Sequence, residues 1–118
     1  MNKLLSFTGA LTLAAVGVWA QSNNARTFTG EIMDSTCAKV GSHEAMRKEH
    51  NIPTAEACTK GCVQAGAKYV LYNPATKTTY QLDNQSKPAA FAGQEVKVTG
   101  KIDASSDTIH VESISPAS

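Results

Sequence analysis

All three cysteines of the 118-residue chain lie in one stretch, between residues 37 and 62. Two of the three histidines and one methionine fall in the same stretch. On both sides of it, short runs alternate between apolar and polar residues, which is typical of half-buried strands. The chain is therefore expected to be a small β-domain that carries its chemistry in one irregular segment.

The first 20 residues have the pattern of a secretory signal peptide. Lys3 supplies a positive start, residues 4–19 are mostly apolar or small, and Val18-Trp19-Ala20 ends in a small residue at the cleavage position. A membrane anchor is disfavoured, because polar residues and glycines interrupt the apolar run and a spanning helix needs about 20 strongly apolar residues. We expect a secreted or periplasmic protein whose mature chain has no membrane span.

The mature chain, residues 21–118, is long enough for one domain with a modest core. The whole chain has 11 basic and 10 acidic residues, and removal of Lys3 with the leader leaves ten of each. A mature net charge of zero gives no attraction to nucleic acid or to an anionic membrane. Nucleic acid is therefore not expected as a partner, and the sequence indicates no other partner.

Five segments are predicted strands: residues 27–33, 68–72, 78–82, 95–101 and 108–114. The first and the last two alternate between apolar and polar residues. Turn residues between the second and third segments predict a hairpin, and residues 86–91 predict a short helix with Pro88 in its first turn. This order predicts a mainly β fold, a small five-stranded antiparallel barrel of OB type. A five-stranded open sheet with one covered face is the alternative.

Residues 34–66 lose the alternation and predict a helical insertion between strands one and two. Residues 43–50 are good helix formers after Ser42, a natural N-cap. Residues 55–64 predict a second helix, with Thr54 as its N-cap and Glu56 in its first turn. Gly30, inside the first strand, indicates a bulge or a sharp bend.

Nearly the whole mature chain resembles an uncharacterised family of small secreted bacterial proteins. The matching features are Gly30 to Cys37, Gly41-Ser42-His43 with Met46, Cys58-Thr59-Lys60-Gly61-Cys62, Ala92 to Gly100 and Ile109-His110-Val111. The resemblance implies an OB-fold-like barrel with a Cys/His/Cys/Cys insertion, and an exported protein. It implies no activity.

A disulfide is the first hypothesis for the cysteines, because exported proteins meet oxidising conditions. Three thiols allow one bridge and leave one thiol over. On a helix, Cys58 and Cys62 would have Cβ atoms about 5–6 Å apart, whereas a disulfide needs roughly 3.5–4.5 Å. We therefore expect Cys37 to pair with one of them and to stabilise the insertion by about 2–4 kcal/mol.

A metal site is the second hypothesis. Cys58 and Cys62, one helical turn apart, would present two sulfur atoms to one point, and Cys37 and His43 could complete a tetrahedron suited to zinc. Met46 lies on the same helical face as His43, and a thioether beside thiolates would favour monovalent copper instead. The spacing Cys-x5-His-x14-Cys-x3-Cys matches no standard zinc motif.

Each of these residues also has an interpretation without a ligand. His43 near a helix start would be solvated, Met46 would be part of the core, and Asp34 would cap a turn. His50 at a helix C-terminus would interact with the helix dipole. His110 would be exposed on the polar face of its strand.

Catalysis has little support in the sequence. Paired carboxylates, a nucleophile elbow and a phosphate-binding glycine loop are all missing. Cys58-x-x-x-Cys62 also differs from the two-residue spacing of thioredoxin-type centres. Tyr69, Tyr72 and Tyr80 could form a stacking platform, but core positions are favoured. The expected function is a non-enzymatic binding or interaction module of the envelope with a disulfide-stapled insertion; metal binding is the alternative, and thiol redox chemistry ranks third.

Overall fold

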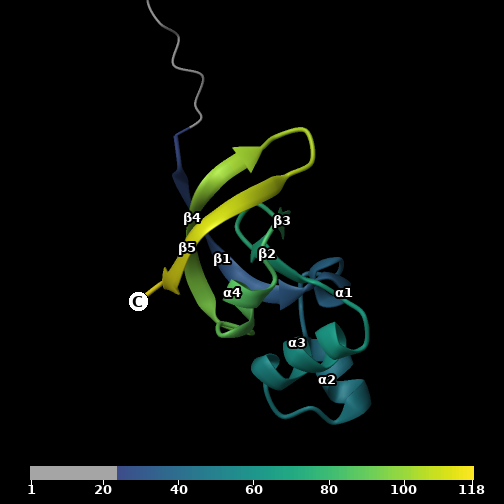
Figure 1. Cartoon of the computed structure of the whole chain (residues 1–118). Coiled ribbons are helices and arrows are strands. Elements are labelled where there is room, and N and C mark those ends of the chain that lie inside the picture. The colour runs from purple at the N-terminus through teal and green to yellow at the C-terminus, as the bar shows by residue number, and fades with distance from the viewer. Residues whose placement is uncertain (1–23) are drawn as a thin grey trace, which may run out of the picture.

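The computed structural model describes residues 24–118 (Figure 1). The predicted signal peptide, residues 1–20, lies outside the described residues. The elements, in chain order, are β1 (Arg26–Asp34), α1 (Ser35–Ala38), α2 (Glu44–His50), α3 (Ala55–Gln64), β2 (Tyr69–Asn73), β3 (Thr78–Leu82), α4 (Ser86–Ala89), β4 (Glu95–Asp103) and β5 (Thr108–Pro116). All five predicted strands and the predicted β2–β3 hairpin are therefore confirmed.

The strands form one sheet whose hydrogen-bonded order is β1-β2-β3-β5-β4. Because β4 also pairs with β1, the sheet closes into a ring. Four neighbouring pairs are antiparallel, but β3 and β5 are parallel, with Gln81 opposite Thr108 and Leu82 opposite Ile109. The prediction of a wholly antiparallel sheet is therefore wrong. The reason is geometric: strand direction cannot alternate all the way round a closed ring with an odd number of strands, so at least one pair must be parallel.

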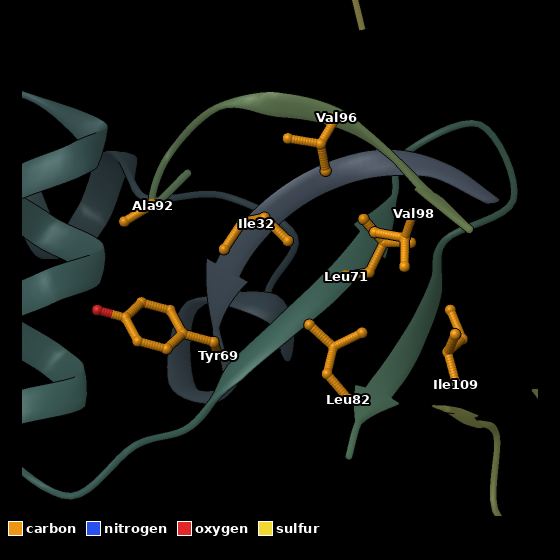
Figure 2. Close-up of a cluster of buried hydrophobic side chains, with 8 residues drawn as sticks. All are labelled: Ile32, Tyr69, Leu71, Leu82, Ala92, Val96, Val98 and Ile109. Carbon is orange, nitrogen blue, oxygen red and sulfur yellow. The ribbon is translucent and has the colours of Figure 1, made fainter. Parts of the chain in front are cut away.

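The main core lies inside the ring. Its buried side chains are Ile32, Tyr69, Leu71, Leu82, Ala92, Val96, Val98 and Ile109 (Figure 2). Alternate residues of a strand point to opposite faces, so the neighbours of these residues in β1 and β2 point outward. Met33, Val70 and Tyr72 are nevertheless buried, in a second cluster that also contains residues of the helical segment. At these residues β1 and β2 are thus covered on both faces.

The helical segment lies between β1 and β2, as predicted, and its three helices gather at one end of the sheet (Figure 1). Helix α3 has the predicted bounds, and the Thr54 side chain accepts a hydrogen bond from the Ala57 N–H at 3.1 Å. Helix α2 begins one residue later than predicted, because His43 occupies the N-cap position. Ser42 still accepts a hydrogen bond from the Glu44 N–H at 3.0 Å. Helix α1 was not predicted, because four residues are too few to show a helical period.

Helix α4 is shorter than the predicted helix over residues 86–91. It follows β3 and precedes β4, as expected. Among residues 24–118, no helix is long and apolar enough to cross a membrane.

Gly30 lies where β1 changes partners. Residues 26–31 pair with β4, and residues 31–34 pair with β2. A Cβ atom at Gly30 would collide with the carbonyl oxygen of Tyr72, so the two backbones approach too closely there for any other residue. The irregular register that the structure records lies elsewhere, between Thr99 and Gly100 of β4.

Substitution of Gly30 by alanine is expected to lower the free energy of unfolding by about 1–3 kcal/mol, because the methyl group would force two paired strands apart. Gly61→Ala is the matched control. Gly61 lies inside α3, and a Cβ atom there meets nothing within 4 Å. That change should raise stability by roughly 0.5–1 kcal/mol through helix propensity. Urea unfolding of both variants measures the difference, and equal effects would contradict the close approach at Gly30.

Candidate metal site

Asp34, the last residue of β1, positions the first cysteine. Its side chain caps α1, with Oδ2 accepting a hydrogen bond from the Cys37 N–H at 2.9 Å. The prediction that Asp34 caps a turn is therefore confirmed. The residue is also 0% exposed, and a carboxylate in such a place needs a compensating partner.

A tight loop after α1 brings His43 back to Cys37. The N–H groups of Val40 and Gly41 both donate to the Cys37 carbonyl, at 3.1 and 2.9 Å. Gly41 has a φ of +73°, and a Cβ atom there would lie 2.6 Å from the hydroxyl oxygen of Tyr72. The loop therefore needs glycine at this turn. As a result His43 is only 8% exposed, and the expectation of a solvated His43 is wrong.

The two ring nitrogens of His43 have different surroundings. Nε2 lies 3.2 Å from Oε1 of Glu31. An ionised carboxylate accepts hydrogen bonds and cannot donate one. Nδ1 is 3.9 Å from Oδ1 of Asp34, too far for a hydrogen bond. In a neutral ring, Glu31 therefore holds the proton on Nε2 and leaves a lone pair on Nδ1. A carboxylate on the distal nitrogen is the usual support of a metal-binding histidine.

Three buried side-chain atoms within residues 24–118 have no hydrogen-bond partner: Asp34 Oδ1, His43 Nδ1 and Thr59 Oγ1. The first two face each other beside Cys37. Buried polar atoms without partners are rare and require an explanation. A cation bound between them would supply one.

Helix α3 contributes the other two sulfur atoms. Cys58 is fully buried, whereas Cys62, one turn further on, is half-buried. Beyond the effect of burial, Asp34 and Cys58 both raise the pKa of Cys62, which places both side chains near its thiol. Each of the two sulfur atoms lies close to Cys37, Cys58 together with His43 and Cys62 together with Asp34.

The ligand atoms form two overlapping groups. Cys37, His43 and Cys58 each offer an atom within 4.8 Å of the others, and so do Asp34, Cys37 and Cys62. Around a tetrahedral zinc ion with Zn–S bonds of about 2.3 Å, neighbouring sulfur atoms would be about 3.8 Å apart. Each group would therefore have to contract, and the two groups would have to merge at Cys37, to bring all four atoms onto one ion.

Burial and the Asp34 carboxylate keep the thiols of Cys37 and Cys62 protonated when no cation is bound. Burial raises the pKa of Cys37, and Asp34 raises it further. The same two causes, with burial the larger, raise the pKa of Cys62 to about 11. Because a metal ligand must be a thiolate, binding would release these protons and would become tighter as the pH rises.

The three cysteines are near one another but not disulfide-bonded in the structure. The predicted bridge from Cys37 to Cys58 or Cys62 is therefore not formed, although Cys37 lies close to both. The sulfur atoms are thus near one another, with Cys37 common to both groups of ligand atoms.

Met46, His50 and His110 lie outside the two groups of ligand atoms. Met46 is partly buried and packs against the second cluster, as a core methionine would. His50 is exposed in the last turn of α2. His110, in β5, is exposed too, and its Nδ1 lies 3.1 Å from Oδ2 of Asp83.

The tyrosines do not form a stacking platform. Tyr69 and Tyr72 are buried, and Tyr80 is partly buried with its ring centroid 5.2 Å from that of Phe28. The core positions that the sequence favoured are therefore confirmed.

Glu31 and Asp34 are the site residues that the sequence did not identify as such. Glu31 has only the signal of a polar position in an alternating strand, which any exposed residue would give. The contact with His43 depends on the loop at Gly41, and no local pattern predicts where that loop returns.

Comparisons with known proteins give one family. A family model described as a protein of unknown function, DUF5818, matches residues 60–117. No curated protein and no solved structure matches the chain. The matched segment contains β2 to β5 and Cys62, but it begins after Cys37, His43 and Cys58. The chain is therefore similar to this family over β2 to β5, while β1 and most of the candidate site lie outside the match.

Proposed function

We propose that this protein binds a thiolate-preferring metal ion, with zinc as the best fit, through Cys37, His43, Cys58 and Cys62. We further propose that the fold is of OB type and that the protein is exported, on the evidence of the strand order and of residues 1–20. The observation that carries the metal proposal is the buried group of Cys37, His43 and Cys58, whose ligand atoms lie within 4.8 Å of one another.

The geometry reverses the order of the two cysteine hypotheses. A disulfide staple uses two sulfur atoms and gives no role to a buried imidazole. Here Glu31 orients the His43 ring and leaves Nδ1 without a partner beside Asp34. Thiolates with one imidazole, in tetrahedral geometry, are typical of structural zinc sites. A divalent cation would also offset the charge of two buried thiolates.

A second arrangement explains part of the same geometry. A protonated His43 between Glu31 and Asp34 would form a buried ion pair, with no metal required. It would not account for the thiols that lie beside the imidazole. Metal binding gives His43 Nδ1 a partner and uses these thiols as well.

Cobalt(II) provides the direct test, because it replaces zinc in thiolate sites and absorbs light. The reduced, metal-free protein is expected to bind one cobalt ion per chain, with thiolate-to-metal charge-transfer absorption and the visible bands of a tetrahedral ion. Zinc should displace it. His43→Gln should weaken binding by about 100-fold, because it removes the nitrogen ligand. His110→Gln, on the other side of the ring, is the matched control and should bind normally.

Absence of the charge-transfer bands in fully reduced protein would contradict the proposal. It would favour the interaction module with an oxidised pair of cysteines. Monovalent copper is the second candidate ion, since Met46 packs against the second buried cluster, which contains Cys37 and Cys58, and a thioether beside thiolates favours this ion. In that case Met46→Leu should weaken copper(I) binding and leave zinc binding unchanged.

A further inference from the structure

A pocket opens beside the proposed metal ligands. Its volume is about 500 Å³, and it is lined by residues of α1, α2 and α3 together with Ile52, Ala65 and Ala67. Of the four proposed ligands, Cys62 is the one that lines it. Cys37, His43 and Cys58 are buried. Cys62 is therefore one of the proposed ligands and also lines the pocket.

Two more metal-binding side chains reach this pocket from α2. Met46 and His50 are one helical turn apart, and both line it. Residues four apart lie on the same face of a helix. The pocket thus has a thioether, an imidazole and a thiol on its walls, and these are donors that zinc and copper accept.

Gly61 gives independent support for an open pocket. It lies inside α3, where glycine is less favourable than alanine, and it also lines the pocket. A Cβ atom at this position would meet nothing within 4 Å, so neither crowding nor an unusual backbone requires glycine. What the missing side chain does is leave free space next to Cys62.

We propose that this pocket is the port through which the metal ion enters and leaves, and that Cys62 is the exchangeable ligand. This inference rests on the proposed metal site. On release, an incoming donor forms a bond to the ion as the Cys62 thiolate leaves it and takes up a proton. The charge of the ion does not change. Cys37, Cys58 and His43 release it afterwards, and Met46 and His50 hold it briefly in the pocket.

Gly61→Leu is designed to fill the port without replacing a ligand. The zinc-loaded variant should transfer its metal to an excess of the chromophoric chelator 4-(2-pyridylazo)resorcinol at least about tenfold more slowly than the unmodified protein, a barrier change of about 1.4 kcal/mol. Its affinity at equilibrium should change little, because entry is slowed as much as release. Ala57→Leu adds the same side chain to an exposed position of α3 and should exchange at the normal rate.

The outcomes separate the port from the site itself. Failure of the unmodified protein to bind zinc contradicts the proposed function. Normal binding with an unchanged exchange rate in Gly61→Leu contradicts the port alone. The double variant Met46→Leu, His50→Gln provides a second measurement that does not disturb α3. It should slow zinc uptake at least about threefold with no loss of zinc affinity, and zinc uptake at the normal rate would also overturn the inference.

Discussion

Zinc is expected to raise the melting temperature of the reduced protein by about 15–30 °C when its free concentration is a thousand times the dissociation constant. A ligand at that excess stabilises the folded state by about 4.1 kcal/mol. For a domain of this size, each kcal/mol shifts the midpoint by roughly 4–8 °C. The effect is large because the ion would join α1 and α3 to His43 at the start of α2, and these elements otherwise meet through a small cluster of buried side chains.

Calorimetry with zinc and then with excess chelator measures this shift. Cys58→Ser is the matched variant, because it keeps the size of a buried side chain and removes one ligand. Its midpoint should respond little to zinc. An equal response in the variant would show that zinc acts at another site, and no response in the unmodified protein would contradict the metal proposal.

Oxidation is expected to abolish metal binding. A small disulfide such as oxidised glutathione can convert Cys37 and either Cys58 or Cys62 into a protein disulfide, and two small thiols are released for each bridge. Both sulfur atoms of the bridge are then lost as thiolate ligands, so the cobalt charge-transfer bands should disappear, and a reductant should restore them. Peptide mapping would identify the bridge, and oxidised protein that still binds one cobalt ion would contradict the shared use of these sulfur atoms.

The rate of this oxidation should depend steeply on pH in the metal-free protein. Burial, with Asp34, raises the pKa of Cys62 to about 11, so only a small fraction is thiolate at neutral pH. Because the thiolate is the attacking species, the rate through Cys62 should rise about tenfold for each pH unit between 7 and 9. A bound metal ion should suppress the reaction. Oxidation that does not depend on pH would show that Cys62 is not the attacking thiol.

The strands were predictable because each leaves a local record. Alternation marks β1, β4 and β5, and turn residues mark the hairpin of β2 and β3. Helix α3 was predicted to the residue, since Thr54 caps it and no proline interrupts it. These features depend on neighbours within a few positions, which the chain itself supplies.

The parallel pairing of β3 with β5 left no such record. Alternation gives a strand and the face that it buries, but not the partner of its edge. Even so, five strands in a closed ring require one parallel pair, so this error could have been avoided by counting. Which pair is parallel depends on where α4 and β4 lead the chain.

The ligand set was only partly predictable. Residue type identified Cys37, His43, Cys58 and Cys62, and helical spacing placed Cys58 and Cys62 on one face. The burial of His43 was missed, because it depends on the turn at Gly41 and its contact with Tyr72. Glu31 and Asp34 were missed as partners for the same reason.

The amino-acid sequence by itself determined the strands, the main helices and the types of ligand available, because each arises from interactions between residues close together in the chain. Only the tertiary structure decided that the strands close into a ring and that two carboxylates surround the imidazole. It also decided that one thiol, Cys62, faces a pocket while the others are buried. These features join residues far apart in sequence, and their separation in space depends on the whole packing.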